Sequence, residues 1–336
     1  MEKKMNALCL IPNEGVKLQQ VRQPESAKPG HLLIKMQACA INPGDKAFIK
    51  LPLPPGSVLS LYNVYGVSGA GTVIATGDGV PEAYRGKKVS MYRSLKFSED
   101  MIGTWCEYAH MHYLDCIILP DDAVPEEYAG SVPNAITPYG FLQQVSAEGH
   151  KGIISTAGTS ATGIAMLGIC LANNFPLVSI VRNEAGKKEL AALGATHIAV
   201  QNDPAFRQQV QEFSKELSAT AIFDGVGGEV LNKIIEVIPN NAAIYLYGYL
   251  GDAIPLTVHT RTLSAKGITI SPFVNFRTET VMNPQRLEKA LQDLRAIFHQ
   301  PHFKTKPGPT YSFAEINDAL AFTAAHGEKP ILSPSA

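Results

Sequence analysis

The sequence of 336 residues lacks an excess of either charge, since 29 Lys and Arg side chains stand against 30 Asp and Glu side chains. Such a balance provides no broad field for nucleic acid or for an anionic membrane surface. No apolar run approaches the roughly 20 residues of a spanning helix, and the basic segment 1–10 lacks the apolar core of a signal peptide. The five cysteines are odd in number and scattered, which favours a reduced, cytoplasmic protein over a disulfide framework.

What the sequence does contain is a strand, a glycine-punctuated turn, a helix and a second strand between residues 151 and 183. Residues 152–156 predict a buried strand and residues 164–172 an apolar helix. A turn of small residues at such a helix start is typical of a dinucleotide pyrophosphate site. Gly158 allows a tight exit, Gly163 close helix packing and Ser160 close approach of a phosphate. The predicted cofactor-binding residues here are Gly158, Thr159, Ser160, Ala161, Thr162 and Gly163.

The second strand, residues 176–181, ends in Arg182 and Asn183. An acidic residue about 20 positions after the turn holds the 2′-hydroxyl of NAD, whereas a guanidinium suits a 2′-phosphate. The pattern therefore predicts NADPH rather than NADH, with Arg182, Asn183 and Lys187 around the phosphorylated ribose. The alternative is that Arg182 is solvated or pairs with Glu184 and that Lys187 is solvated.

The pattern of predicted secondary structure changes near residue 120. Short strands at 32–38, 69–75 and 86–92 predict a small antiparallel β domain. From residue 128 onward strands alternate with helices, and six strands with crossovers predict a doubly wound parallel sheet in an α/β protein. We expect residues 1–122 and 275–336 to form the first domain and residues 123–274 to form the second.

Further candidates follow the ends of the predicted parallel strands, where open α/β sheets bind their ligands. Gln201 is a candidate neighbour of the adenine. The remaining candidates for the cofactor groove are Val226, Tyr247, Gly248, Phe273 and Val274. Plain turn chemistry explains the glycines near these positions almost equally well.

A series of short segments occurs in a specific order and spacing: residues 40–45, 69–73, 103–105, 134–139, 158–163, 193–195 and 224–228. Together they resemble the zinc-free medium-chain dehydrogenase/reductases of the quinone oxidoreductase and trans-2-enoyl reductase type. The resemblance implies a GroES-like β-barrel domain and a Rossmann NAD(P)-binding domain, with the active site in the cleft between them. It also implies a homodimer formed through the sixth strand of the Rossmann sheet, near residues 268–270.

The resemblance also argues against zinc. Zinc-dependent members have a cysteine where this chain has Asn42 and a His-Glu pair where it has Val67 and Ser68, and a catalytic zinc needs three N, S or O ligands. The four clustered cysteines of a structural zinc lobe are also missing. His110 and His112 share one face of a predicted strand, where we expect ordinary exposed histidines, so no metal site is predicted.

Without a metal or a covalent nucleophile, the chemistry that remains is hydride transfer from a nicotinamide. The acceptor must then already be electrophilic, as a quinone or an α,β-unsaturated carbonyl is. The resemblance places Asn42 beside the nicotinamide, where its amide would donate to a developing oxyanion or to the cofactor, and Thr137 at the nicotinamide end. Asp45 is expected to fix the loop, and Asn42 before a proline is alternatively a turn residue.

One departure concerns proton donation. The tyrosine that the enoyl reductase branch has 11 residues after this asparagine is Leu53 here. Tyr62 or Tyr65 would replace it if the loop folds differently, although tyrosines beside apolar residues more often pack. Because quinones and reactive enones take a proton from water, the loss favours those substrates.

We therefore predict an NADPH-dependent, zinc-independent oxidoreductase that reduces small-molecule quinones or α,β-unsaturated carbonyls. It is expected to have neither nucleic acid nor membrane partners. Two alternatives stay open. One is a trans-2-enoyl-thioester reductase acting on CoA or acyl-carrier-protein thioesters, and the other is a non-catalytic NADPH-binding regulatory protein.

Overall fold

The computed structural model describes residues 2–50, 60–96, 98–251, 253–324 and 327–334. The chain divides into two compact units. Unit 1 comprises Met1–Asn134, Pro284–His299 and Phe303–Ala336, and unit 2 comprises Ala135–Asn283 and Gln300–His302.

Unit 1 contains a large sheet with the strand order β14-β15-β3-β4-β5-β7, in which β6 also pairs with β3. The pairs are antiparallel except for β14 with β15. The strands are β3 (His31–Ala40), β4 (Ser68–Thr76), β5 (Lys88–Tyr92), β6 (Tyr108–His112), β7 (Cys116–Ile118), β14 (Pro307–Tyr311) and β15 (Lys329–Leu332). A separate antiparallel hairpin is formed by β1 (Lys4–Ile11) and β2 (Gly15–Arg22).

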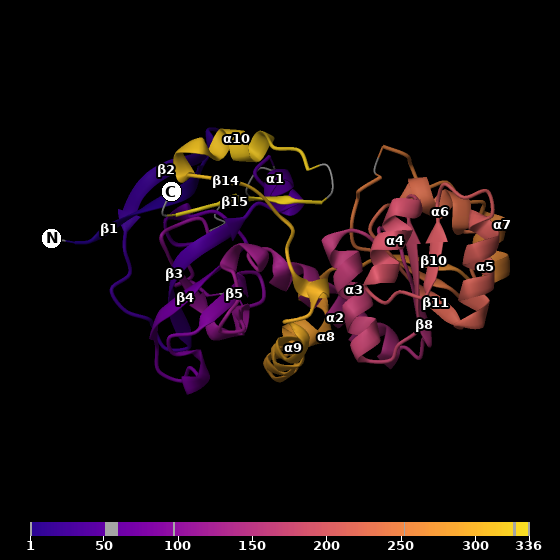
Figure 1. The fold of residues 1–336 in the computed structure, drawn as a ribbon, viewed down its shortest axis with the longest axis horizontal. Helices are drawn as coiled ribbons and strands as arrows, with labels where there is room; N and C mark the ends of the chain where they lie inside the picture. The colour runs from indigo at the N-terminus through magenta and orange to yellow at the C-terminus, as the bar shows by residue number, and fades with distance from the viewer. Residues whose placement is uncertain (1, 51–59, 97, 252, 325–326, 335–336) are drawn as a thin grey trace. The chain divides into compact units, whose positions relative to one another are not determined.

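The carboxyl-terminal strand β15 lies beside β3, although nearly 300 residues separate them in the chain. Ile331 pairs with Ala40 and Leu332 with Cys39, and Figure 1 shows the yellow β14 and β15 next to the violet β3. All four residues of β15 are buried, as expected for a strand covered on both faces. This pairing brings the start of β15 to the place where β3 leads into α1 (Pro43–Phe48).

The helical segments of unit 1 are short apart from α9. They are α1 (Pro43–Phe48), η1 (Leu61–Asn63), η2 (Glu82–Tyr84), η3 (Tyr113–Asp115), η4 (Pro125–Glu127), α9 (Pro284–Ile297), η7 (Phe313–Glu315) and α10 (Ile316–Ala321). Two further segments cross the division between the units, α2 (Ser131–Ala147) and η6 (Pro301–Phe303).

Unit 2 is built on six parallel strands in the order β10-β9-β8-β11-β12-β13. They are β8 (Gly152–Ser155), β9 (Leu177–Val181), β10 (His197–Val200), β11 (Ala219–Asp224), β12 (Ala243–Leu246) and β13 (Thr269–Pro272). β8 and β9 are buried at every position, as a sheet covered by helices on both faces requires. The predicted α/β class with a doubly wound parallel sheet is confirmed.

Helices cover both faces of this sheet, with α3 and α4 drawn on one side of β8 and β11 and α5 on the other (Figure 1). The helical segments are α3 (Ala161–Ala172), α4 (Glu184–Ala192), α5 (Phe206–Glu216), α6 (Gly228–Ile234), α7 (Thr260–Lys266), η5 (Asn275–Arg277) and α8 (Glu279–Met282). Among the described residues, none of the helices has the length and apolar character needed to cross a membrane.

Candidate functional site

The turn from β8 into α3 combines a strained residue, a capped helix and a glycine without room for a side chain. Ala157 has a φ of 54°, a left-handed conformation that costs an alanine roughly 1–2 kcal/mol. Ser160 is the N-cap of α3, and its Oγ accepts a hydrogen bond from the Gly163 N–H at 3.1 Å. A Cβ on Gly163 would lie 2.4 Å from the Ala157 carbonyl oxygen. The turn thus holds the start of a 12-residue helix close to the strand end, where N–H groups and the helix dipole attract a phosphate.

The two glycines of this turn serve packing, and the special backbone conformation falls one residue earlier than predicted. The left-handed residue is Ala157, whereas a Cβ on Gly158 would lie 3.0 Å from both the Ile180 carbonyl oxygen and the Leu190 Cδ1. Gly158 and Gly163 are buried, and the predicted residues between them are partly exposed: Thr159, Ser160, Ala161 and Thr162.

Arg182 follows β9, the strand paired with β8. It is exposed, and its guanidinium has no ion pair or hydrogen bond with any residue that the structure describes. Glu184 pairs instead with Lys187, at 3.9 Å. Asn183 caps α4, since its Oδ1 accepts a hydrogen bond from the Gly186 N–H at 3.0 Å. The alternative pairing of Arg182 with Glu184 is therefore not formed, and the guanidinium is available to an anion.

Two loops at the carboxyl ends of β10 and β11 are held by side chains. The predicted adenine neighbour Gln201 donates from Nε2 to the Glu229 Oε1 at 2.9 Å. Asp224, at the end of β11, accepts from the Thr156 Oγ1 at 2.7 Å and from the Gly227 N–H at 2.8 Å. Burial raises the pKa of Asp224, and these hydrogen bonds oppose that shift. The Asp224 carboxylate thereby fixes the loop that carries Val226.

Several aromatic rings pack together under these loops. Tyr247 stacks on Phe223 with ring centroids 3.9 Å apart, and Phe273 meets Phe141 and Phe223 edge-on at 5.3 and 5.7 Å. A Cβ on Gly225 would lie 2.6 Å from the Tyr247 hydroxyl, so this glycine makes room for the ring. Phe273 is 6% exposed and belongs to the core of unit 2 rather than to an open groove wall.

The other predicted groove residues stay near the strand ends. A Cβ on Gly248 would lie 3.0 Å from the Gly225 carbonyl oxygen, which indicates a packing role. Val226 is buried and Val274 half-buried. Thr137 of α2 accepts a hydrogen bond from the Asn275 Nδ2 at 3.0 Å, which places it beside the segment that follows β13.

A buried polar network in unit 1 joins Asn42, Asp45, Ser68 and Lys329, and we call it the Asn42 network. The Asn42 Nδ2 donates to the Asp45 Oδ2 and to the Ser68 Oγ, both at 2.9 Å. The Lys329 Nζ donates to the Asn42 Oδ1 at 2.6 Å. The Asp45 Oδ2 also accepts the Asn42 backbone N–H at 2.8 Å, which holds the start of α1. Because both amide hydrogens of Asn42 are engaged, donation to a bound molecule would require one of these bonds to be exchanged.

Burial sets the electrostatics of this network. It raises the pKa of Asp45, while hydrogen bonds from Asn42 and the charges of Arg93 and Lys329 lower it. Burial also lowers the pKa of Lys329 to about 8, and the Asp45 charge opposes that shift. A lone buried ammonium or carboxylate would be costly, so each charge depends on the other.

Tyr65 is placed for packing rather than for proton donation. It is 1% exposed, its ring meets Trp105 edge-on at 5.0 Å, and its hydroxyl donates to the Asp45 carbonyl oxygen at 2.9 Å. Burial, followed by the Asp45 charge, raises the pKa of Tyr65, which disfavours loss of its proton. Tyr62 is 46% exposed with a φ of 61°, and Leu53 lies outside the described residues.

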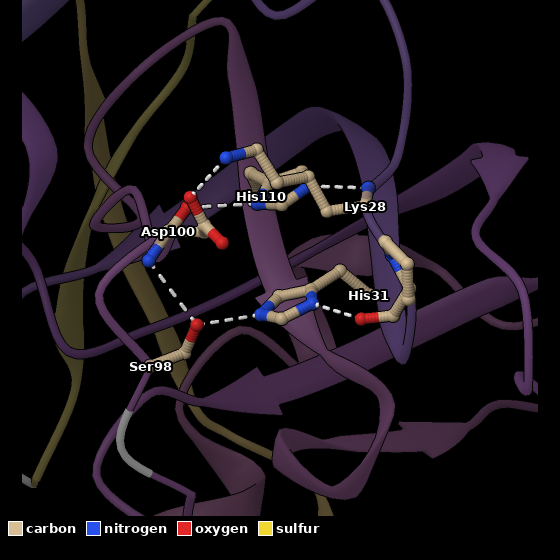
Figure 2. A network of polar contacts seen from close by, with 6 residues as sticks. Lys28, His31, Ser98, Asp100 and His110 are labelled. Atoms are coloured by element: carbon tan, nitrogen blue, oxygen red, sulfur yellow. Dashed lines mark hydrogen bonds and ion pairs between the residues drawn. The ribbon is translucent and has the colours of Figure 1, made fainter.

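The histidines of β6 belong to a cluster. The antiparallel register of β3 and β6 pairs His31 with His112, and the His31 ring stacks on His110 with centroids 4.8 Å apart. The expectation of exposed strand histidines is wrong for His110, which is 3% exposed. Its Nε2 accepts the Lys28 N–H at 3.1 Å, and its Nδ1 lies 2.8 Å from the Asp100 carbonyl oxygen (Figure 2).

These contacts give both ring nitrogens of His110 backbone partners, which fixes a neutral ring with its proton on Nδ1. His112 similarly accepts the Leu114 N–H through Nδ1 at 3.1 Å. Over the described part of the chain, no group of three or more His, Cys, Asp or Glu side chains is arranged to hold a metal ion.

Sequence reasoning missed Lys329, the cation of the Asn42 network. Its partner Asn42 is 287 positions away, so no local motif joins them. The only signal was a lysine directly before the apolar residues of a predicted closing strand. Such a lysine is ordinarily solvated.

The chain is similar to one protein-family model and to several known proteins. Residues 28–121 match the alcohol dehydrogenase GroES-like domain. The synaptic vesicle membrane protein VAT-1 homolog of Homo sapiens is 25% identical over 329 residues, covering 91% of this chain and 79% of that protein. The mitochondrial enoyl-[acyl-carrier-protein] reductase of Yarrowia lipolytica is 25% identical over 228 residues, covering 65% and 59%.

Among solved structures, a candidate NADPH:quinone reductase from Mesorhizobium loti superposes with a TM-score of 0.75 at 24% identity. The alignment covers 99% of both chains. These comparisons confirm the resemblance predicted from the sequence and the combination of a GroES-like domain with a Rossmann sheet.

Proposed function

We propose that this chain, which has the fold of a medium-chain dehydrogenase/reductase over its whole length, is an NADPH-dependent, zinc-independent oxidoreductase. It reduces quinones or α,β-unsaturated carbonyls by hydride transfer. The observation that carries the proposal is the close-packed turn between β8 and α3, with the exposed, unpaired Arg182 at the end of the adjacent strand. Similarity to a candidate NADPH:quinone reductase supports the proposed cofactor and acceptor class.

The residues of unit 2 suit a phosphorylated dinucleotide. The start of α3 offers backbone N–H groups to a diphosphate, and the Ser160 side chain is turned into the cap rather than outward. Arg182 offers a planar pair of donors to a 2′-phosphate. Hydrogen bonds to charged groups are worth about 1.5–3 kcal/mol, which corresponds to roughly a 10- to 150-fold preference for NADPH.

Bound NADPH supplies the hydride, and the protein supplies orientation and electrostatics. In unit 2 we propose Thr137 as a contact of the nicotinamide end. In unit 1 we propose Asn42 as the polar group nearest the reacting atoms, held by Asp45 and Ser68. The substrate is expected to take its proton from water, since the Tyr65 hydroxyl is buried and already bonded.

Cofactor choice is tested by fluorescence titration of the wild type and Arg182→Ala with NADPH and NADH. We expect the wild type to prefer NADPH at least 10-fold. Arg182→Ala should weaken NADPH binding by about 10- to 150-fold, with little change for NADH. Lys188→Ala is the matched control, because it removes an exposed cation from α4. Equal wild-type affinities for both cofactors would contradict the choice of NADPH.

The reaction is tested by NADPH oxidation with benzoquinones, simple enones and crotonyl thioesters. Quinones and enones should be consumed fastest, before and after treatment with a chelator. Activity that is lost on chelation and restored by zinc would contradict a zinc-independent enzyme.

A trans-2-enoyl-thioester reductase is the second candidate, favoured by the similarity to the enoyl-[acyl-carrier-protein] reductase of Yarrowia lipolytica. Faster consumption of enoyl thioesters than of quinones would establish it. Tight NADPH binding without turnover of any acceptor would indicate the non-catalytic regulatory protein instead.

We also propose a cytoplasmic homodimer. All five cysteines are free and buried, which suits a reducing compartment. Within the described part of the chain, β13 is the last strand of its sheet and pairs only with β12, which leaves an edge for a second copy. Analytical ultracentrifugation tests the dimer, and a monomer at micromolar concentration would contradict it.

A further inference from the structure

Lys329 is a buried cation brought to Asn42 by strand pairing. The pairing of Ile331 with Ala40 sets β15 beside β3, and the Ile41 N–H donates to the Pro330 carbonyl oxygen at 3.1 Å. Lys329, 7% exposed, is therefore held at the point where β3 leads into Asn42. Its ammonium donates to the Asn42 Oδ1 at 2.6 Å and approaches the Gly130 carbonyl oxygen at 3.5 Å.

The surrounding chain leaves space for a lysine here. A Cβ on Gly130 would lie 2.8 Å from the Lys329 Nζ and 2.9 Å from its Cδ. The Thr305 Oγ1 accepts the Gly130 N–H at 3.0 Å and bonds Ser131 at 3.1 Å. The backbone at Gly130 is thus held beside the lysine stem, and its missing side chain provides the space that the stem fills.

The lysine also settles which way the Asn42 amide is turned. An ammonium only donates, so it must face the Asn42 oxygen, and the amide nitrogen must then face the Asp45 carboxylate and Ser68. Without Lys329, the Asn42 oxygen loses its strongest partner and the buried Asp45 loses a compensating charge. An ionised Asp45 favours the same orientation, because a carboxylate only accepts, but it leaves the buried Asn42 oxygen without a donor.

We propose that Lys329 is a positioning residue for the reduction: its ammonium fixes the orientation of the Asn42 carboxamide and balances the charge of Asp45. This inference rests on the proposed function for its effect on turnover. Its effect on Asn42 itself is a property of unit 1 and is testable without a substrate.

The first test separates positioning from simple charge compensation. Lys329→Met should lower kcat by about 10- to 100-fold, as misplacement of a reacting group by about 1 Å does, with the KM for NADPH changed less than threefold. The double variant Lys329→Met with Asp45→Asn removes both charges together. We expect it to regain most of the thermal stability but not kcat. Recovery of both would show that Lys329 only compensates charge and would overturn the proposal.

Gly130→Ala keeps the charge but displaces it, because the added methyl meets the flexible end of the lysine. We expect a several-fold loss of kcat with a small change in stability. The control Lys17→Met removes an exposed lysine of β2 in the same unit and should leave kcat and stability unchanged. If Lys329→Met does not fold, Gly130→Ala and the double variant still decide the question.

The second test follows the Asn42 side-chain amide by NMR in ¹⁵N-labelled protein, with Asn42→Asp to assign its resonances. Both amide hydrogens are buried and bonded, so they should exchange slowly with water in the wild type and at least 10-fold faster in Lys329→Met. Unchanged exchange would overturn the proposal. A wild type that reduces no acceptor but shows this difference would contradict the proposed function and leave the positioning of Asn42 established.

Discussion

Replacing Gly163 by alanine tests whether the turn between β8 and α3 is a close-packed cradle. The new Cβ would stand 2.4 Å from the Ala157 carbonyl oxygen and 2.7 Å from that of Gly158. Overpacking typically costs 1–3 kcal/mol, and backbone obstructions put this case near the upper end. The better helix propensity of alanine returns about 1 kcal/mol. We therefore expect a net loss of about 2 kcal/mol in the free energy of unfolding.

The strain is relieved only if the start of α3 moves away from the turn, so NADPH affinity should also fall, by on the order of 10-fold. Urea unfolding followed by circular dichroism measures the first effect and NADPH fluorescence the second. The control is Gly140→Ala in α2, where the Cβ would meet the Thr278 Oγ1 at an ordinary 3.4 Å. If Gly163→Ala matches the wild type in both unfolding and NADPH binding, the turn is not a close-packed cradle.

Two further predictions concern unit 1. Tyr65→Phe should lower the free energy of unfolding by only about 1 kcal/mol, because the Asp45 carbonyl oxygen keeps the Ile49 N–H as a partner. The kcat should change less than twofold. A kcat loss above 10-fold in an enone assay would instead identify Tyr65 as the proton donor. Burial lowers the pKa of His110 from 6.5 and that of His112 to about 4, assisted by the His31 charge and, for His112, by Lys96. The unfolded state therefore binds more protons than the folded state, so the free energy of unfolding should decrease as the pH falls from about 6.5 towards 4. Urea unfolding of the wild type and His112→Gln at several pH values measures this effect. We expect a shallower pH dependence in the variant.

The fold of unit 2 was predictable because its signals are local. Each parallel strand is a short apolar run bounded by turn residues, and β9 (Leu177–Val181) was predicted to within one residue, as 176–181. The observed start of a helix differs from the predicted one where the first large apolar residue comes after the first helical turn. α3 starts at Ala161, whereas the apolar residues suggested a start at Ile164. The cradle and the guanidinium after β9 were predictable for the same reason, since they lie within one βαβ unit.

Contacts that depend on strand register were not predictable from spacing. His31 meets His110 and His112 only because β3 pairs with β6, which buried a ring expected on the surface. Lys329 meets Asn42 only because β15 pairs with β3.

Packing also reassigned single residues. Phe273 follows a strand end, as a groove residue should, yet its ring turns into the aromatic core. Ala157 rather than Gly158 adopts the left-handed conformation, although glycine has the lower intrinsic cost there.

The chemistry of the Asn42 network bears on the proposed zinc independence more strongly than the missing cysteine does. A zinc ion bound to the Asn42 oxygen would compete with the Lys329 ammonium, which holds that oxygen at 2.6 Å. Two unit charges 4 Å apart repel by about 4 kcal/mol at an effective dielectric of 20, and a divalent ion doubles this. Loss of the lysine proton is the less costly route, since burial lowers the pKa of Lys329 to about 8 and so makes the neutral amine accessible. Either route loses the charge-assisted hydrogen bond from Lys329 to Asn42, which is worth about 1.5–3 kcal/mol, so the network opposes a metal at this oxygen through its own residues.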